Sequence, residues 1–180
     1  LGNIKTIFWT YNILDFAPLL NVSATNASGE HVPTTGTWFS HHLELATGES
    51  VETGLDRLRG WWGLEGAWPA DDDADGAVVG STYASAHGLA VGDSFTLTRE
   101  GITRDFTVRG IITSGDDADR GVFIQLAQAQ ALIGREGAVG SVEVSALTTP
   151  DNDLARKAAK NPNSLTVKEK ETWYCTAYVS

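Results

Sequence analysis

The residues best suited to chemistry in this sequence are the aspartates of DDDADGAVVGST, residues 71–82. Asp71, Asp73 and Asp75 occupy positions 1, 3 and 5 of a calcium-binding loop, where each carboxylate supplies the ion with an oxygen ligand. Such a loop also needs a bidentate carboxylate at position 12, but this position holds Thr82. We therefore interpret the three aspartates as part of an acidic surface loop, with a weak ion site as the alternative.

The histidines are a second set of metal ligands, but their spacing argues against one shared site. His41 and His42 are adjacent, so on a strand their rings point to opposite faces. The sequence contains no Cys-x-x-Cys, His-x-x-x-His or His-Glu-x-x-His motif. We therefore predict no bound metal or cofactor, and we name His31, His41 and His42 as the histidines to test as ligands.

Three tryptophans, Trp61, Trp62 and Trp68, form a cluster in the sequence. Exposed aromatic rings can stack on sugars or anchor a protein partner, whereas buried rings pack between elements. Packing is the more common role of such rings. We therefore expect the three rings in the core, and we keep a partner or ligand surface as the alternative.

Composition and charge exclude several classes of function. The 180 residues carry a net charge of −10, so the protein repels nucleic-acid backbones, and nucleic acid is not an expected partner. No window approaches the ~18–20 apolar residues of a membrane-spanning helix. Neither a G-x-S-x-G elbow nor a glycine-rich phosphate loop occurs, so we predict no catalytic residue and no nucleotide site.

The elements that must position these residues are strands and short helices. Residues 18–25 and 31–39 flank the turn NASGE and predict a hairpin. Residues 43–68 contain too many glycines for a long helix and predict short elements and loops. The opening residues 4–16 are compatible with a short amphipathic helix or an irregular segment.

A strand followed by a helix is predicted directly after the acidic loop. Residues 77–80, AVVG, form the apolar strand, and residues 81–87 form the helix. Ser81 is a suitable N-cap, because its hydroxyl can accept a hydrogen bond from the first turn. Gly88 is a helix stop signal, because glycine adopts the left-handed backbone conformation without strain.

A second hairpin is the clearest pattern in the sequence. Residues 94–98 and 104–113 alternate with period two around a turn, which places Phe106, Val108 and Gly110 on one face. Further elements are predicted as strands over residues 121–126 and 140–147 and as helices over residues 127–134, 151–160 and 166–180.

Six short segments follow one another in order over residues 30–147. They are GTWF, WWGLEGAWPADD, AVVGSTYASAHGLAVGDSFTL, RDFTVRGIIT, GVFIQLAQAQALIG and GSVEVSAL. The series resembles the extracytoplasmic core domain of MacB/FtsX-like ABC transporter permeases. In that family an apolar pair followed by Gly, a GL-x-VGD segment and an AQ-x-L helix occur in this order, and they match Val78 to Gly80, Leu89 to Leu97 and Gly121 to Leu132. Each segment alone is weak, but the order is specific.

The ends of the chain show a narrower resemblance. Residues 4–18 and 161–180 are similar to the segments next to the membrane in a subgroup of these permeases that is associated with metal uptake, with iron as the expected metal. The sequence contains no Met. The resemblance accounts for this if the chain is a domain cut out between the first and second membrane helices, on the extracytoplasmic side of the cell membrane.

The resemblance implies an α+β fold in two parts. Residues 1–70 and 121–180 would form a membrane-proximal α/β subdomain, and residues 71–120 would form an inserted β-rich subdomain.

The function implied by the resemblance is mechanical and not catalytic. The domain would couple ATP-driven movement of the membrane helices to substrate or partner handling outside the membrane. The implied partners are a cytoplasmic ATPase subunit, a second permease copy or paralogue, and an extracytoplasmic binding protein. The alternative is an extracytoplasmic module that binds a metal ion or a carbohydrate, the latter through Trp61, Trp62 and Trp68.

Overall fold

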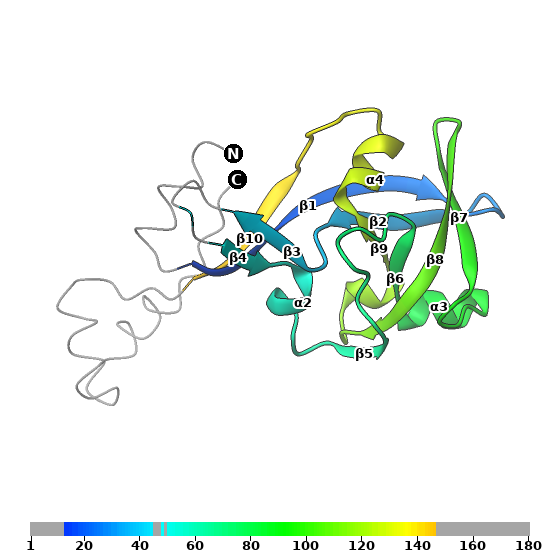
Figure 1. Cartoon of the computed structure of the whole chain (residues 1–180). Helices are drawn as coiled ribbons and strands as arrows, with labels where there is room; N and C mark the ends of the chain where they lie inside the picture. The colour runs from blue at the N-terminus through cyan, green and yellow to red at the C-terminus, as the bar shows by residue number, and fades with distance from the viewer. Residues whose placement is uncertain (1–12, 45–47, 49, 147–180) are drawn as a thin grey trace, which may run out of the picture. The chain divides into compact units, whose positions relative to one another are not determined.

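The computed structural model describes residues 13–44, 48 and 50–146 (Figure 1). The strands are β1 (Ile13–Thr25), β2 (His31–Thr37), β3 (His41–Glu44), β4 (Ser50–Thr53), β5 (Gly63–Gly66), β6 (Gly76–Gly80), β7 (Ser94–Arg99), β8 (Ile102–Thr113), β9 (Val122–Gln125) and β10 (Ser141–Ala146). The helices are α2 (Leu55–Leu58), α3 (Ser81–His87), the short 3₁₀-helix η1 (Asp117–Arg120) and α4 (Leu126–Leu132). The mixture of strands and short helices confirms the predicted α+β class.

The chain divides into two compact units, and the larger one consists of Asp15–Glu143. The other unit consists of Leu1–Leu14 and Val144–Ser180. The large sheet has the strand order β10-β1-β2-β9-β6-β8-β5, with β7 paired to β1 and β8. The strands β3 and β4 form a separate antiparallel pair.

The hairpin of β1 and β2 confirms the prediction for residues 18–25 and 31–39. Asn26 closes its turn, because the side-chain oxygen accepts hydrogen bonds from the backbone N–H groups of Ser28 and Glu30 at 3.1 and 3.0 Å. The local side-chain chemistry of the turn therefore determines where the chain reverses.

The strand β6 lies inside the sheet and is buried along its whole length. It pairs in parallel with β8 and antiparallel with β9. Both of its faces are covered, because Ala77 and Val79 belong to the main hydrophobic cluster and Val78 belongs to a second cluster. An uninterrupted apolar run is typical of a strand with two buried faces, and the prediction of a strand at 77–80 is confirmed.

The helix α3 confirms the helix predicted over residues 81–87, but its N-cap differs from the prediction. Ser81 is already helical and Gly80 is the N-cap, so the predicted capping role of Ser81 is wrong. A side chain at Gly80 would overlap the backbone of Ala118 and Asp119, so the close approach of that loop requires glycine at this boundary. At the other end, Gly88 has φ 64° and ends the helix as predicted.

The strand β8 contains an extra residue where it runs beside β6. Ala77 is opposite Val108, but the next residue, Val78, is opposite Gly110. Arg109 is therefore the additional residue of a β-bulge. Because side chains alternate with period two along a strand, one extra residue exchanges the two faces of β8 beyond this point.

The bulge corrects one prediction for the second hairpin. The hairpin of β7 and β8 is confirmed, but Phe106, Val108 and Gly110 do not share one face. Phe106 and Val108 pack in the main cluster, whereas Gly110 faces the side chain of Leu64, which packs against the second cluster together with Ile112. The prediction was wrong because alternation was extended through a position where the chain inserts a residue.

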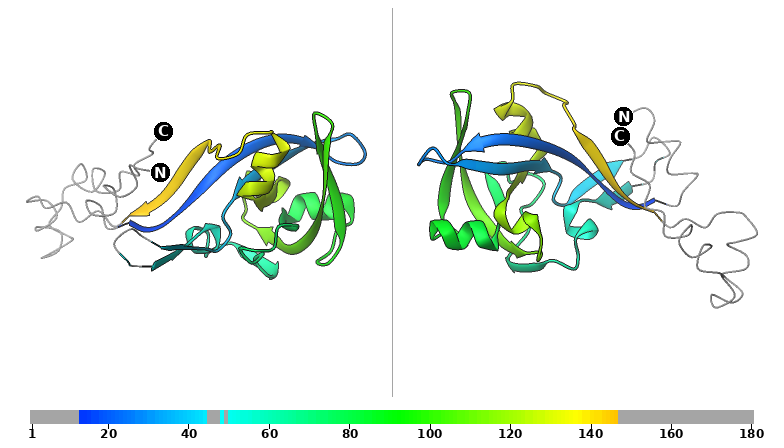
Figure 2. Two further views of the ribbon diagram at one scale, coloured as in Figure 1. Left: turned by 45° about the horizontal axis from the view of Figure 1, so that its top comes forward. Right: turned by 180° about the vertical axis from the view of Figure 1, so that it is seen from behind.

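The strand β9 and the helix α4 confirm the strand and helix predicted at 121–126 and 127–134. β9 pairs in parallel with β2, and α4 lies over these two strands (Figure 2). The helix approaches β2 closely at Gly36, where Ala129 fills the space that a side chain on Gly36 would need. The absence of a side chain on Gly36 therefore determines the distance between helix and sheet.

The remaining elements match the sequence predictions where the structure describes them. The segment 43–68 forms β3, β4, α2 and β5, which confirms short elements and loops, and β10 confirms the strand predicted at 140–147 as far as Ala146. Residues 13–16 belong to β1 and not to a helix. Residues 4–12 and the helices predicted at 151–160 and 166–180 lie outside the described residues.

The division into two subdomains stays a prediction. Strands from the segment 71–120, namely β6 and β8, belong to the same sheet as β1, β2 and β9. Any inserted subdomain at 71–120 would therefore be continuous with the sheet and not separated from it by a linker.

The close contact at Gly36 predicts a stability effect. Gly36→Ala should lower the free energy of unfolding by about 1–3 kcal/mol, because the added methyl group overlaps Ala129 and forces α4 away from β2. Gly60→Ala is the matched control, since a side chain there meets nothing closer than a carbonyl oxygen at 3.7 Å, and it should change stability by less than about 0.5 kcal/mol. Urea unfolding followed by circular dichroism measures both, and equal midpoints for the two variants would contradict the packing argument.

Candidate functional site

The first aspartate of the acidic loop is paired with a histidine. His41 Nδ1 lies 2.7 Å from Asp71 Oδ1, and the imidazole ring stacks on the Trp38 ring with centroids 4.1 Å apart. The pair joins β3 to the acidic loop, across 30 positions of sequence. The structure thus brings together two of the candidate ligands, and they contact each other.

The other two candidate aspartates make different contacts. Asp73 binds the guanidinium of Arg109 in bidentate fashion, with Nε to Oδ2 at 2.7 Å and Nη2 to Oδ1 at 3.3 Å. The hydrogen bond that Arg109 donates to the Asp73 carboxylate raises the pKa of Arg109 above its ordinary value. Asp75 accepts a hydrogen bond from the N–H of Thr107 through its backbone carbonyl. Among the residues that the structure describes, no group of three or more His, Cys, Asp or Glu side chains could hold a metal ion.

The remaining histidines lie apart from the acidic loop. His31 on β2 is within 2.6 Å of the Ser23 hydroxyl on β1. His42 follows His41 on β3 and is more exposed than His41, as expected for alternate faces of a strand. His87, at the end of α3, lies 3.4 Å from the Glu30 carboxylate. The structure therefore does not assemble His31, His41 and His42 into one site.

The three clustered tryptophans divide between core and surface. Trp62 and Trp68 pack against the second hydrophobic cluster, with Trp62 next to Phe123 at 5.6 Å between ring centroids. Trp61 is 70% exposed. Arg59 lies 5.3 Å from the centroid of the Trp61 ring and 5.6 Å from that of Trp62. The prediction of a packing role is therefore confirmed for Trp62 and Trp68. It is wrong for Trp61, whose ring is exposed to solvent.

Arg59 was not identified from the sequence. It forms an ion pair with Glu143 of β10 while its guanidinium lies over the tryptophan rings. The two ends of this contact are 84 positions apart in the sequence, so no local pattern indicates it. An arginine within two residues of paired tryptophans is the only sequence signal that could have suggested the cation–π contact.

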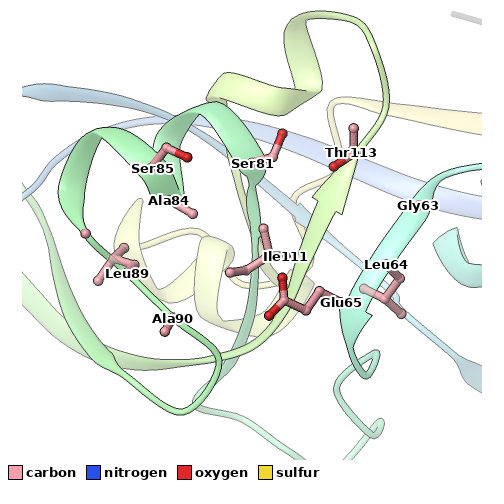
Figure 3. A pocket seen from close by; sticks show the side chains of 11 residues that line it. Gly63, Leu64, Glu65, Ser81, Ala84, Ser85, Leu89, Ala90, Ile111 and Thr113 are labelled. Atoms are coloured by element: carbon pink, nitrogen blue, oxygen red, sulfur yellow. The ribbon is translucent and has the colours of Figure 1, made fainter.

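A hollow with a volume of about 530 Å³ lies between α3 and β5 (Figure 3). Its polar side chains are Glu65, Ser81, Ser85 and Thr113, and Leu89 and Ile111 belong to its apolar wall. The helix α3 packs over β6 and β8, and the hollow is the part of the sheet beside β5 that the short helix leaves open. No sequence motif indicated it, because its residues come from three separate segments.

The loop that joins β8 to β9 is stabilised by two carboxylates. Asp119 accepts hydrogen bonds from the N–H groups of Ser114 and Gly115 at 2.6 and 3.0 Å. Asp116 accepts one from the N–H of Ala118 at 2.8 Å. Because these bonds favour the charged form, above all the one from Ser114, the pKa of Asp119 is lowered. The backbone N–H of Ala118 likewise lowers the pKa of Asp116.

This second acidic cluster, residues 114–121, is a solvated turn in which part of the negative charge is neutralised locally. Arg120 pairs with Asp117 at 2.8 Å on the surface. The carboxylates of Asp116 and Asp119 are used within the loop itself. The cluster therefore shapes the connection between β8 and β9.

Comparison with known families identifies the class of this protein. The sequence profile of the MacB-like periplasmic core domain matches residues 11–161. Because the match spans most of the chain, the protein belongs to this family, and it is the extracytoplasmic part of a membrane ABC transporter permease.

A solved structure shares the fold. The extracellular domain of the noncanonic ABC-type transporter YknZ from Gram-positive bacteria superimposes with a TM-score of 0.55 at 12% sequence identity. The alignment covers 82% of this chain and 72% of that one. Comparison with curated proteins finds no significant match. Within the described ranges, no helix has both the length and the apolar character needed to cross a membrane.

The Asp119 contacts predict how stability depends on pH. A carboxylate with a lowered pKa stabilises the fold above the ordinary aspartate range, and this contribution is lost as the pH falls through the lowered pKa, below about pH 4. Asp119→Asn should therefore lower the Tm by about 2–4 °C at pH 7. At pH 3 the difference from the wild type should shrink, because the pH is then below the ordinary pKa of aspartate and the wild type has begun to lose this contribution.

Asp117→Asn is the matched control for this measurement. It removes the same charge from the same loop, but the only partner of the Asp117 side chain among the described residues is Arg120, in an exposed ion pair. Its Tm should stay within about 1 °C of the wild type, as expected for a surface ion pair. A difference for Asp119→Asn that is the same at pH 7 and pH 3 would show that charge is not the cause.

Proposed function

We propose that this domain couples ATP-driven movement of the membrane helices to the handling of a substrate or partner outside the membrane. The observation that carries the proposal is the family match over residues 11–161. The packing of the sheet supports it, because two hydrophobic clusters cover the opposite faces of β6. A closely packed sheet moves as a body and can transmit a displacement from one end to the other.

In this proposal the domain has no catalytic role of its own. ATP would be hydrolysed by a cytoplasmic ATPase subunit, as expected for the permease of an ABC transporter. The sequence contains no phosphate-binding glycine loop, which is consistent with this division of labour. The further partners we propose are a second permease copy or paralogue and an extracytoplasmic binding protein.

The cargo is the least constrained part of the proposal. The predicted link to iron uptake rests on the resemblance of residues 4–18 and 161–180, and it stays a prediction. No contact among the described residues favours a metal-ion or carbohydrate module over a coupling domain, since the candidate histidines are separated and two of the three tryptophans are packed.

Coupling predicts that the extracytoplasmic domains move with the nucleotide state. A spin label at Thr103→Cys, on exposed β8 near the hairpin turn, reports the distance between two permease copies in the full transporter. With the native cysteines replaced, that distance should change by about 5 Å or more between the nucleotide-free and ATP-bound states, as in rigid-body switching. Pulsed electron paramagnetic resonance measures it.

A label pair within one domain is the control. Cysteines at Ser28 and Glu136 lie in the same compact unit, so their separation should be the same in both nucleotide states. Identical distances between copies in both states would refute coupling by domain movement, whereas a change in the Ser28–Glu136 distance would show that the domain deforms.

A further inference from the structure

The strand β5 is at one end of the described sheet and pairs only with β8. An edge strand has backbone N–H and C=O groups on one side that no neighbouring strand satisfies. Gly63, Glu65 and Gly66 are exposed and Leu64 is half-buried, so the strand is accessible from solvent. This edge can accept a further strand by backbone hydrogen bonding.

The hollow described above borders this edge and has a defined chemistry. Glu65 is directly opposite Ile111, and Gly63 is opposite Thr113, so these residues share the face that is turned toward α3. The Glu65 carboxylate points into the hollow (Figure 3). Glu65 is the only charged residue of the lining, and it forms no ion pair with any described residue. The complementary group is therefore a cation.

Exposed apolar side chains flank the same edge. Only four large hydrophobic residues of the described chain are exposed, and Trp61 and Val91 are two of them. Trp61 precedes β5 by two positions, and Val91 contacts the other end, since a side chain on Gly66 would lie 3.0 Å from its methyl group. Exposed aromatic rings next to an accessible edge are typical of sites that bind protein.

We propose that the β5 edge and the adjoining hollow bind an extended, basic segment of a partner protein. The segment adds to the sheet as a strand beside β5 and places a Lys or Arg side chain against Glu65. A polypeptide is the ligand that satisfies both features, because only a peptide backbone can pair with the edge while its side chain enters the hollow. This inference rests on the proposed function in one respect, namely that the domain handles a partner outside the membrane.

The spacing of the site makes the proposal specific. Alternate residues of an added strand point to the same face and are separated by about 7 Å. One basic side chain would reach Glu65, and the residue two positions away would lie beside Gly63, which has no side chain of its own and is exposed. In a bound segment, alternate side chains should therefore face the hollow. The segment should also contain few prolines, since proline cannot donate a backbone hydrogen bond.

A peptide-display selection against the full 180-residue chain tests the proposal. A random twelve-residue library should yield peptides that share one Lys or Arg within a stretch poor in proline. For a synthetic peptide recovered in this way, fluorescence polarisation should show that Glu65→Gln weakens binding about tenfold, the loss of one charge-assisted hydrogen bond. Glu136→Gln removes the same charge from an exposed loop outside the site and should leave Kd unchanged.

Hydrogen exchange then locates the bound peptide. Protection of amides within Gly63–Gly66 in the complex is the expected result. Recovery of no peptide, recovery of acidic peptides, equal Kd values for Glu65→Gln and wild type, or protection at other strands would each overturn the proposal. Concentration-dependent protection of β5 without any peptide would assign the edge to a second copy of this chain instead. These measurements need no ATPase, so their failure leaves the coupling proposal intact, and failure of the spin-label test leaves this one intact.

Discussion

The exchange of faces in β8 is the constraint on which the rest of this structure depends. One extra residue, Arg109, lies between Val108, which faces the main cluster, and Gly110, which faces Leu64 in the second. A strand without the bulge would keep alternate residues on one face along its whole length, whereas alternate residues of this strand face the main cluster before Arg109 and the second cluster after it. The same residue then binds Asp73, so the bulge also holds the acidic loop against the sheet.

The acidic segments are used structurally within a chain of net charge −10. Asp71 contacts His41 and Asp73 contacts Arg109. Asp119 instead accepts backbone hydrogen bonds, which stabilise the carboxylate without a counter-charge. Neighbouring negative charges are thus stabilised in two ways, by a cationic or imidazole partner in one loop and by backbone N–H groups in the other. Both kinds of contact fix a loop at the end of a central strand. Glu65, in the lining of the hollow, differs from these aspartates because its carboxylate has no ionic partner among the described residues.

The open end of the sheet follows from the length of α3. The helix extends only from Ser81 to the left-handed residue Gly88, and it covers β6 and β8. The chain then returns toward β7 and leaves the face of β5 uncovered, which creates the hollow lined by Glu65 and Thr113. A short helix closed by glycine is therefore compatible both with a well-packed centre of the sheet and with an accessible edge at β5.

The sequence by itself determined most of the elements, because alternation, apolar runs and turn residues such as Asn26 act over a few neighbouring positions. Its ordered series of segments carried the resemblance that implied the family and the α+β class. It did not indicate the bulge at Arg109, the glycine cap at Gly80 or the separation of Trp61 from the packed rings. These features depend on contacts between segments distant in the chain, and only the tertiary structure decided them. The hollow beside Glu65 is of the same kind, since three segments meet there and none carries a motif.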